Sequence, residues 1–273
     1  MKSEIEKILK DNHFNIFGFC KFESVLPLFP TRSQNRLPRN PKSIITFLFP
    51  YKTDYEGERN LSLYCIGKDY HDIIYSRLNR LCSLLSERFK DGEFAAFCDT
   101  SPINECLAAY NSGLGFMGKN GLLINEVYGS YCFIGEIVTN LEFEKYSIPL
   151  GNCLGCDKCT QNCIGGALTK DGFLKENCLS FITQKKGELS KEEEALIKKG
   201  GLVWGCDGCI LSCPMNKNAK NCEDEDFISS LLPFLTEENL GEISDRAYNY
   251  KGEKILRRNI GIIYEKPVNN NGK

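Results

Sequence analysis

Hydrophobic residues recur with helical spacing close to the start of the chain. Ile5, Ile8 and Leu9 form one apolar stripe, with charged residues between them. Ser3 followed by Glu6 predicts a capping box at the beginning of this helix. The pattern therefore predicts a short amphipathic helix before the first strand.

A longer amphipathic helix is predicted over residues 69–90, with Asp69 as its N-cap. Its apolar positions follow one another at spacings of three and four: Ile74, Leu78, Leu81, Leu85 and Phe89. This spacing places them on one face of the helix. A third helix is expected to begin with Ser101 as N-cap and Pro102 as first helical residue, and to end at Gly113.

Short apolar runs predict the strands. Residues 43–49 (SIITFLF) are apolar and rich in β-branched side chains, which is typical of a buried strand. Residues 93–97 (EFAAF) predict a second strand. Residues 121–125 and 131–139 predict two more, joined by a turn that contains Gly129.

The composition changes near residue 150, where clustered cysteines replace periodic apolar positions. We expect residues 1–150 to form a mixed α/β domain and residues 151–222 to form a small domain whose core depends on bound metal. Residues 223–273 are expected to form a short helical extension that ends in a frayed Asn/Gly/Lys tail. Within the second part, residues 188–199 predict a solvent-facing helix.

The overall composition is that of an ordinary globular protein, with 273 residues, 42% hydrophobic and 26% charged. No apolar run approaches the ~20 residues of a membrane span, and the first residues lack a signal-peptide core. We therefore expect a cytoplasmic protein with no membrane partner. The net charge of −2 argues against a wholly basic surface for nucleic acid, but it allows a local patch. Candidates for such a patch, or for a solvated helix face, are Arg246, Lys251, Lys254, Arg257 and Arg258.

Cysteine is unusually frequent, with 15 residues against two histidines. Without an export signal, such a number indicates metal or redox chemistry rather than disulfides. The cysteines fall into two spaced groups with one between them: Cys153-x2-Cys156-x2-Cys159-x3-Cys163, then Cys178, then Cys206-x2-Cys209-x3-Cys213-Pro214. The first spacing is that of bacterial ferredoxins, in which three cysteines bind one cubane cluster and the fourth binds the other.

Two [4Fe–4S] clusters need eight thiolates, and these positions supply eight. Ligand exchange between the motifs predicts one cluster on Cys153, Cys156, Cys159 and Cys213. The other cluster is then expected on Cys163, Cys178, Cys206 and Cys209. A zinc site formed by Cys156, Cys159, Cys206 and Cys209 is the alternative. The remaining cysteines have no ligand spacing and are expected to pack as small hydrophobes: Cys20, Cys65, Cys82, Cys98, Cys106, Cys132 and Cys222.

A glycine-rich stretch, Gly113-Leu-Gly115-Phe-Met-Gly118, matches a dinucleotide-binding motif in letters alone. That motif needs a strand before it and a helix after it, so that a helix N-terminus meets the phosphate. Here the predicted order is reversed, which argues against nucleotide binding. The glycines instead allow close approach of a bulky ligand, and Lys119 and Asn120 add polar groups beside it.

The stretch from Cys98 to Thr139, the two cysteine groups and the segment Gly67-Lys-Asp-Tyr-His71 together resemble the epoxyqueuosine reductase family. The resemblance implies an α+β fold, in which a nitroreductase-like cobalamin domain precedes a ferredoxin-like double-cluster domain. It places the catalytic acid on Asp99. It places cobalamin contacts on Leu123, Ile134, Ser180, Cys206 and Asp207, with Lys119 and Asn120 nearby, and a tRNA contact on Lys186.

The resemblance implies an enzyme that deoxygenates epoxyqueuosine in the anticodon loop of a tRNA. Reduced ferredoxin or flavodoxin would supply electrons, two [4Fe–4S] clusters would pass them to cobalamin, and Asp99 would donate a proton in a monomeric protein. Residues 251–263 resemble the start of the family's tRNA-gripping helical repeats, so the chain is expected to be a short member. The alternatives are a related cobalamin-dependent reductase of another small organic substrate, a non-enzymatic iron–sulfur electron carrier, and an RNA-binding module.

Overall fold

The computed structural model describes residues 1–144, 146–149 and 151–264. The chain forms two compact units, each assembled from separate segments. The first unit contains residues 1–52, 70–156 and 214–224, and the second contains the remainder. The frayed tail expected at the end of the chain falls largely on residues 265–273, outside the described residues.

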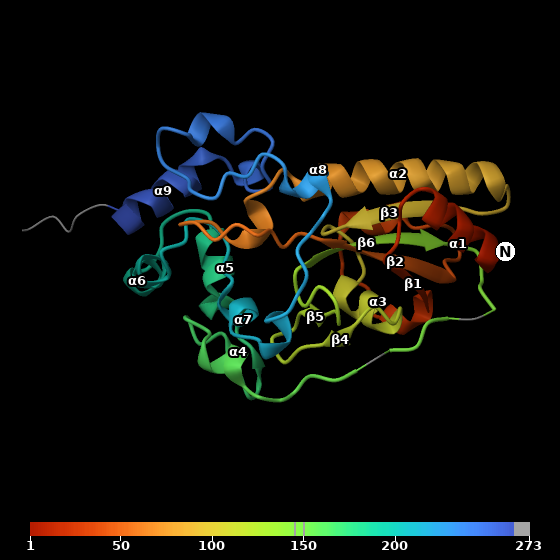
Figure 1. The fold of residues 1–273 in the computed structure, drawn as a ribbon, viewed down its shortest axis with the longest axis horizontal. Coiled ribbons are helices and arrows are strands. Elements are labelled where there is room, and N and C mark those ends of the chain that lie inside the picture. Colours follow the sequence, from red (N-terminus) through yellow and green to blue (C-terminus); the bar gives the residue numbers. More distant parts are fainter. Residues whose placement is uncertain (145, 150, 265–273) are drawn as a thin grey trace, which may run out of the picture. The chain divides into compact units, whose positions relative to one another are not determined.

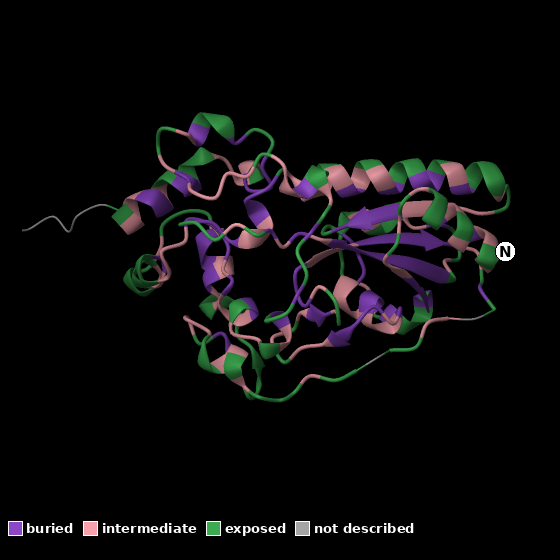
Figure 2. Cartoon of the chain, viewed as in Figure 1, coloured by how far each residue is buried: buried purple, intermediate pink, exposed green. Residues whose placement is uncertain are grey.

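The first unit is built on a four-stranded antiparallel sheet (Figure 1). Its strands are β1 (Phe17–Lys21), β2 (Ser43–Pro50), β6 (Cys132–Thr139) and β3 (Phe94–Cys98), in that spatial order. The strands predicted at 43–49, 93–97 and 131–139 are confirmed. Figure 2 shows β2 and most of β6 buried, as expected for two central strands with apolar side chains on both faces.

Two helices pack on opposite faces of this sheet. α2 (Tyr70–Arg88) lies against the face on which Gly135 approaches Ile74 and Leu78. α3 (Glu105–Asn111) covers the other face, where Ala108 packs with Phe97 and Val138. Neighbouring residues of β6 therefore point to different helices, as the two-residue repeat of a strand requires.

Two predicted helix starts are wrong. α1 (Lys2–Asp11) begins after Met1, with no side-chain cap, so Ser3 and Glu6 form no capping box. The N-cap of α3 is Asn104, whose side chain accepts a hydrogen bond from the Leu107 amide, rather than Ser101. The predicted end is supported by Gly113, which follows α3 with φ of 69°.

The glycine motif, residues 113–118, contains β4 (Phe116–Met117), which forms a small hairpin with β5 (Leu123–Ile124). A Cβ atom on Gly115 would stand 2.4 Å from the carbonyl oxygen of Ile124. This glycine therefore lets two strands of the chain itself approach each other. β5 pairs with β4 rather than with β6, so the predicted strands at 121–125 and 131–139 do not belong to one sheet.

The second unit is mainly helical. Its helices are α4 (Lys158–Gln161), α5 (Leu179–Thr183), α6 (Lys191–Gly200), α7 (Gly208–Leu211), α8 (Glu225–Ile228) and α9 (Glu253–Tyr264). β7 (Leu168–Thr169) and β8 (Gly172–Phe173) form a hairpin. α6 confirms the predicted solvent-facing helix and begins with a capping box formed by Ser190 and Glu193. Short 3-10 helices occur in both units. Those of the first unit are Phe22–Val25, Arg32–Arg36 and Pro214–Asn216, and those of the second are Leu63–Cys65, Lys175–Asn177, Leu240–Glu242 and Asn249–Lys251.

Long-range contacts hold the second unit together. Residues 53–69 belong to it because Leu61 pairs with Trp204 and because Asn60 exchanges two hydrogen bonds with the backbone of Leu235. From α9, the buried Asn259 side chain donates to the carbonyl oxygens of Thr183 and Val203, both at 2.8 Å. The compact units therefore divide the chain differently from boundaries at residues 150 and 222. None of the described helices is long and apolar enough to cross a membrane.

Candidate active site and cluster-binding residues

Asp99 lies directly after β3, where the chain turns sharply. Its φ of 57° is in the left-handed region, which Asp tolerates better than most residues. The Asp99 carboxylate oxygen Oδ2 is 3.2 Å from Nε2 of His71, the second residue of α2. The Asp99 side chain is 57% exposed, whereas that of His71 is 24% exposed. An accessible acid is thus held beside a histidine that is largely covered.

Aromatic rings fix the position of His71. The Tyr70 ring stacks on His71 with centroids 3.9 Å apart, and it stacks on Phe133 of β6 at 4.0 Å. One turn along α2, the Tyr75 hydroxyl donates to the carbonyl oxygen of Cys98 and lies 3.1 Å from the Thr100 hydroxyl. Both sides of the Asp99 turn are therefore tied to α2.

Asp99 opens into a cavity of about 330 Å³. Its lining combines aromatic and aliphatic side chains with polar groups: Phe29, Tyr70, Asp99, Ser101, Ile103, Asn104, Glu105, Cys106, Cys132, Phe133 and Ile134. The volume lies at the lower end of the range for small-molecule sites. Of the residues predicted to contact cobalamin, Ile134 lines this cavity. Leu123 packs in a hydrophobic cluster with Leu48 and Ala109, to which Ile134 also contributes.

Two further carboxyl groups belong to this region, because Glu105 lies close to both Asp99 and Glu136. Glu136 of β6 is fully buried, and its Oε2 accepts a hydrogen bond of 2.6 Å from the Ser101 hydroxyl. Burial raises the pKa of Glu136 to about 7. Burial, followed by the charges of Glu136 and Asp99, raises the pKa of Glu105 well above its usual range. A glutamate within the apolar run CFIGEIVT was the signal in the sequence for this buried acid.

Four thiols gather within the second unit. The charges of Cys163 and Cys178 act on both Cys206 and Cys209, so these side chains are electrostatic neighbours. Burial is the largest cause that raises the pKa of Cys206, and it raises that of Cys209 to about 12. This set of four is the predicted ligand set of one cluster. The backbone amides of Ala167 and Gly208 donate to Sγ of Cys163 and Cys206 respectively, as is typical around cluster thiolates.

The other predicted ligand set is divided between the units. Cys153 and Cys156 belong to the first unit, whereas Cys159 and Cys213 belong to the second, so this assignment stays a prediction. Among the described residues, no three His, Cys, Asp or Glu side chains are arranged to hold a single metal ion. The cysteines without ligand spacing were expected to pack as small hydrophobes. This is confirmed for the five that are buried: Cys20, Cys65, Cys82, Cys98 and Cys222. Cys106 and Cys132 are partly exposed.

The remaining predicted contacts lie in both units. In the first, Lys119 is exposed in the β4–β5 turn, and the Asn120 amide nitrogen is buried without a hydrogen-bond partner among the described residues. In the second, Ser180 is partly buried on α5, and Lys186 is exposed soon after that helix.

Asp207 has a clear structural task within the second unit. Its carboxylate is 2% exposed and accepts hydrogen bonds from Arg59 at 2.6 Å, from Ser62 and from the Leu63 amide. These contacts attach residues 59–63 to the start of α7.

The basic residues near residue 250 do not act as a free patch. Arg246 is 7% exposed and donates to the carbonyl oxygen of Ser230. Arg258 donates to the carbonyl oxygens of Lys185 and Gly187, while Arg257 pairs with Glu253. Three of the five cations are thus used within the second unit, which weakens the RNA-binding interpretation.

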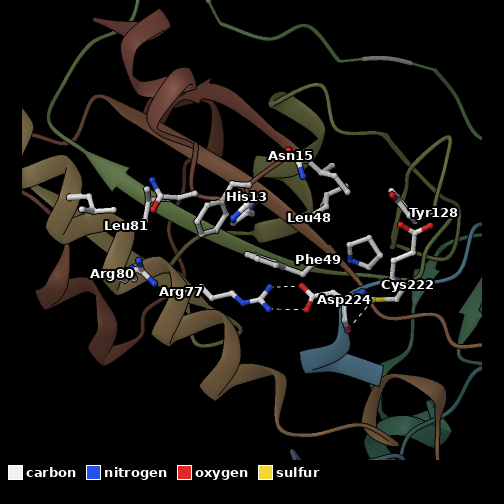
Figure 3. Close-up of a pocket in the computed structure, with 16 residues that line it drawn as sticks. His13, Asn15, Leu48, Phe49, Arg77, Arg80, Leu81, Tyr128, Cys222 and Asp224 are labelled. Atoms are coloured by element: carbon white, nitrogen blue, oxygen red, sulfur yellow. Dashed lines mark hydrogen bonds and ion pairs between the residues drawn. The ribbon is translucent and has the colours of Figure 1, made fainter. Parts of the chain in front are cut away.

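A larger cavity, about 580 Å³, lies elsewhere in the first unit and contains none of the predicted site residues (Figure 3). Phe49 and Leu48 form part of its apolar lining, with His13 close by. Figure 3 shows the Arg77 guanidinium facing the Asp224 carboxylate in a bidentate ion pair. One of its contacts, from Nη2 of Arg77 to Oδ1 of Asp224, measures 2.9 Å. This pair joins α2 to residues 222–224, so the arginine contributes to packing.

Comparison with known proteins gives matches over both parts of the chain. Residues 32–100 match the family model "Epoxyqueuosine reductase QueG, DUF1730", and residues 152–216 match "4Fe-4S double cluster binding domain". An epoxyqueuosine reductase of Lactococcus garvieae is 33% identical over 222 residues, which cover 77% of this chain. The chain spans 62% of the length of that relative.

Solved structures share the fold. An epoxyqueuosine reductase from Streptococcus thermophilus superposes with a TM-score of 0.81 and 27% identity, covering 96% of this chain and 80% of that one. An epoxyqueuosine reductase solved with an epoxyqueuosine-modified tRNA-Tyr stem loop gives a TM-score of 0.79 at 23% identity, with coverage of 96% and 80%. The predicted mixed α/β fold with a double-cluster segment is confirmed at this level.

Proposed function

Because this chain belongs to the epoxyqueuosine reductase family, we propose that it reduces the epoxide of epoxyqueuosine in a tRNA anticodon loop. The observation that carries the proposal is the contact between His71 and Asp99, because Asp99 also lines the 330 Å³ cavity. It offers a proton donor beside a space for a small reacting group. The first unit is then the nitroreductase-like, cobalamin-binding domain.

In this proposal Asp99 is the general acid. An epoxide oxygen becomes a good leaving group when it receives a proton, and general acids contribute ~10²–10⁴-fold to such reactions. The exposed Asp99 side chain can reach a substrate, while His71 orients its carboxylate from the α2 side. Stacking by Tyr70 limits the movement of His71 and therefore the positions open to Asp99.

The thiols support two [4Fe–4S] clusters. Soft thiolates are the usual ligands of iron–sulfur cores. Cys163, Cys178, Cys206 and Cys209 are electrostatic neighbours in the second unit. The double-cluster match spans these four and all of the remaining predicted ligands: Cys153, Cys156, Cys159 and Cys213. We propose reduced ferredoxin or flavodoxin as the electron donor to a monomeric protein.

Cobalamin would supply a low-potential metal centre that reduces the substrate once the clusters have reduced it. The first unit offers groups suited to its amide-bearing rim and apolar ring. The buried amide nitrogen of Asn120 needs an acceptor, which a cofactor amide oxygen provides. Ile134 and Leu123 present aliphatic surface in one cluster. In the second unit, Ser180, Cys206 and Asp207 are the proposed contacts, and Lys186 is the proposed contact to tRNA.

The experiment is turnover of epoxyqueuosine-modified tRNA by protein loaded anaerobically with iron, sulfide and cobalamin, read by mass spectrometry of the nucleosides. We expect wild type to form queuosine and Asp99→Asn to bind cobalamin normally but to turn over at least about 100-fold more slowly. Glu87→Gln, on the exposed face of α2, is the matched control.

Three other results would each contradict a part of the proposal. Absence of a cobalamin spectrum after loading would favour an iron–sulfur electron carrier. Cobalamin binding without conversion of the tRNA would favour a reductase of another small organic substrate. Normal turnover by Asp99→Asn would remove Asp99 from the acid role.

A further inference from the structure

Two carboxyl groups near Asp99 have no part in the function proposed above: Glu136 is fully buried and Glu105 is half-buried. Glu136 points from β6 to the face covered by α3, because Gly135 next to it faces α2. One of its oxygens accepts from Ser101, and the other, Oε1, has no hydrogen-bond partner within the described part of the chain. Glu105, on α3, lines the same cavity as Asp99 and accepts a hydrogen bond from the Asp99 backbone amide.

A fully buried carboxylate with an unpartnered oxygen is costly, whereas the protonated acid is much less so. Burial accordingly raises the pKa of both glutamates, and the two like charges oppose joint ionisation. The titratable neighbours are Cys106 on α3, Cys20 on β1, Asp99 after β3 and His71 on α2. Burial raises the pKa of both thiols, so these stay neutral. The raised pKa of Glu105 and Glu136 favours the protonated form of each acid.

The proposed reaction needs more protons than Asp99 holds. Removal of an epoxide oxygen as water consumes two electrons and two protons, and leaves a carbon–carbon double bond. A single carboxylic acid gives one proton and becomes a carboxylate. While a tRNA loop covers the exposed Asp99, a second proton must come from inside the protein.

We propose that Glu105 and Glu136 act as an internal proton store, which returns one proton to Asp99 during each turnover. An O–H bond of the glutamate pair breaks, the Asp99 carboxylate gains the proton, and the pair keeps one negative charge until solvent restores it through Asp99. Glu105, Ser101 and Asp99 all line the 330 Å³ cavity, which has room for several waters of about 30 Å³ each. The inference rests on the proposed function.

The test compares Glu105→Gln, Glu136→Gln and the double variant with wild type, using the loaded protein. The first measurement needs no substrate: the infrared carbonyl stretch of a protonated carboxylic acid near pH 7. We expect this band in wild type, in Asp99→Asn and in the exposed control Glu87→Gln. We expect the double variant to lack it.

The second measurement is the single-turnover rate on epoxyqueuosine-modified tRNA against pH. We expect the wild-type rate to fall as the pair loses its proton above about pH 7. The double variant should be about 100-fold slower at neutral pH, with a flat profile in this range. Glu136→Asp keeps a carboxyl group and should restore part of the pH dependence, which a purely structural role would not do. Cluster absorbance and circular dichroism check that each variant is folded.

The failures are distinguishable. If the band is absent from wild type, or if the double variant turns over at the wild-type rate, the proton store is wrong and the proposed function stands. If the band is present and is lost in the double variant, but wild type leaves the tRNA unchanged, the proposed function is wrong. The proton store then has no reaction to supply and is wrong as well.

Discussion

Replacing Glu136 by glutamine should change how the stability of the protein depends on pH. Glutamine matches the shape of glutamic acid, stays neutral, and can still accept the hydrogen bond from Ser101. The folded-state pKa of Glu136 is about 7, against 4.5 for the unconstrained group. Folding therefore favours the protonated form, and the stability that this form provides is fully present below pH 4.5 and lost as pH rises through 7.

The size of the effect follows from that difference in pKa. Each unit of pKa corresponds to about 1.4 kcal/mol, so wild type should lose about 3 kcal/mol relative to Glu136→Gln between about pH 4.5 and pH 8. For a protein of this size, 1 kcal/mol shifts the melting temperature by about 2–4 °C. The difference in melting temperature between the two proteins should thus change by about 6–12 °C across this range, in favour of glutamine at high pH.

The assay is thermal unfolding of the loaded proteins, without oxygen, followed by circular dichroism at several pH values. A poor fit of the glutamine amide at the position of the unpartnered Oε1 would lower the stability of the variant equally at every pH. The change of the melting difference with pH is therefore the quantity that tests the prediction. Repeating the comparison in Glu105→Gln separates the coupling between the two acids. A melting difference that stays constant from pH 4.5 to pH 8 would refute the reasoning.

Two further predictions concern the second unit. Cys178→Ala should remove about half of the bound iron and one of two cluster signals in EPR spectra, because Cys178 lies close to Cys206 and Cys209. Cys222→Ala is the control, and full iron content in Cys178→Ala would disprove the ligand count. Asp207→Ala should lower the free energy of unfolding by about 3–5 kcal/mol, since it leaves the Arg59 guanidinium without its carboxylate partner. A melting temperature within about 2 °C of wild type would contradict this.

The sheet of the first unit could be predicted because its signals are local. The apolar pattern of each strand lies within a few consecutive residues, at 43–49, 93–97 and 131–139. These apolar residues form the strands that the helices cover. The spacing of the cluster cysteines is likewise visible in the chain. The helix starts were predicted wrongly. The Ser101 hydroxyl accepts from the Ile103 amide and donates to Glu136, 35 residues later, while Asn104 caps α3.

The contacts around Asp99 could not be predicted from the sequence. Asp99 could be proposed from a family resemblance, but its contact with His71 joins the beginning of α2 to the end of β3. Glu105 and Glu136 come together through the packing of α3 on the sheet, which no short pattern encodes. Likewise, the glycines at 113–118 suggested space for a ligand, whereas Gly115 accommodates the neighbouring strand.

The interleaved path of the second unit has a consequence for its folding during synthesis. Asn60 leaves the ribosome long before Leu235, to which it is bonded, and Asn259 comes after both carbonyl groups that it binds. Contacts between residues so distant in sequence cannot form until the later segment emerges, and they slow folding. Residues 53–69 therefore stay without their partners while more than a hundred further residues are translated. When translation is fast, chaperones would be needed to bind that segment and prevent aggregation, and slower translation should raise the yield of correctly folded protein.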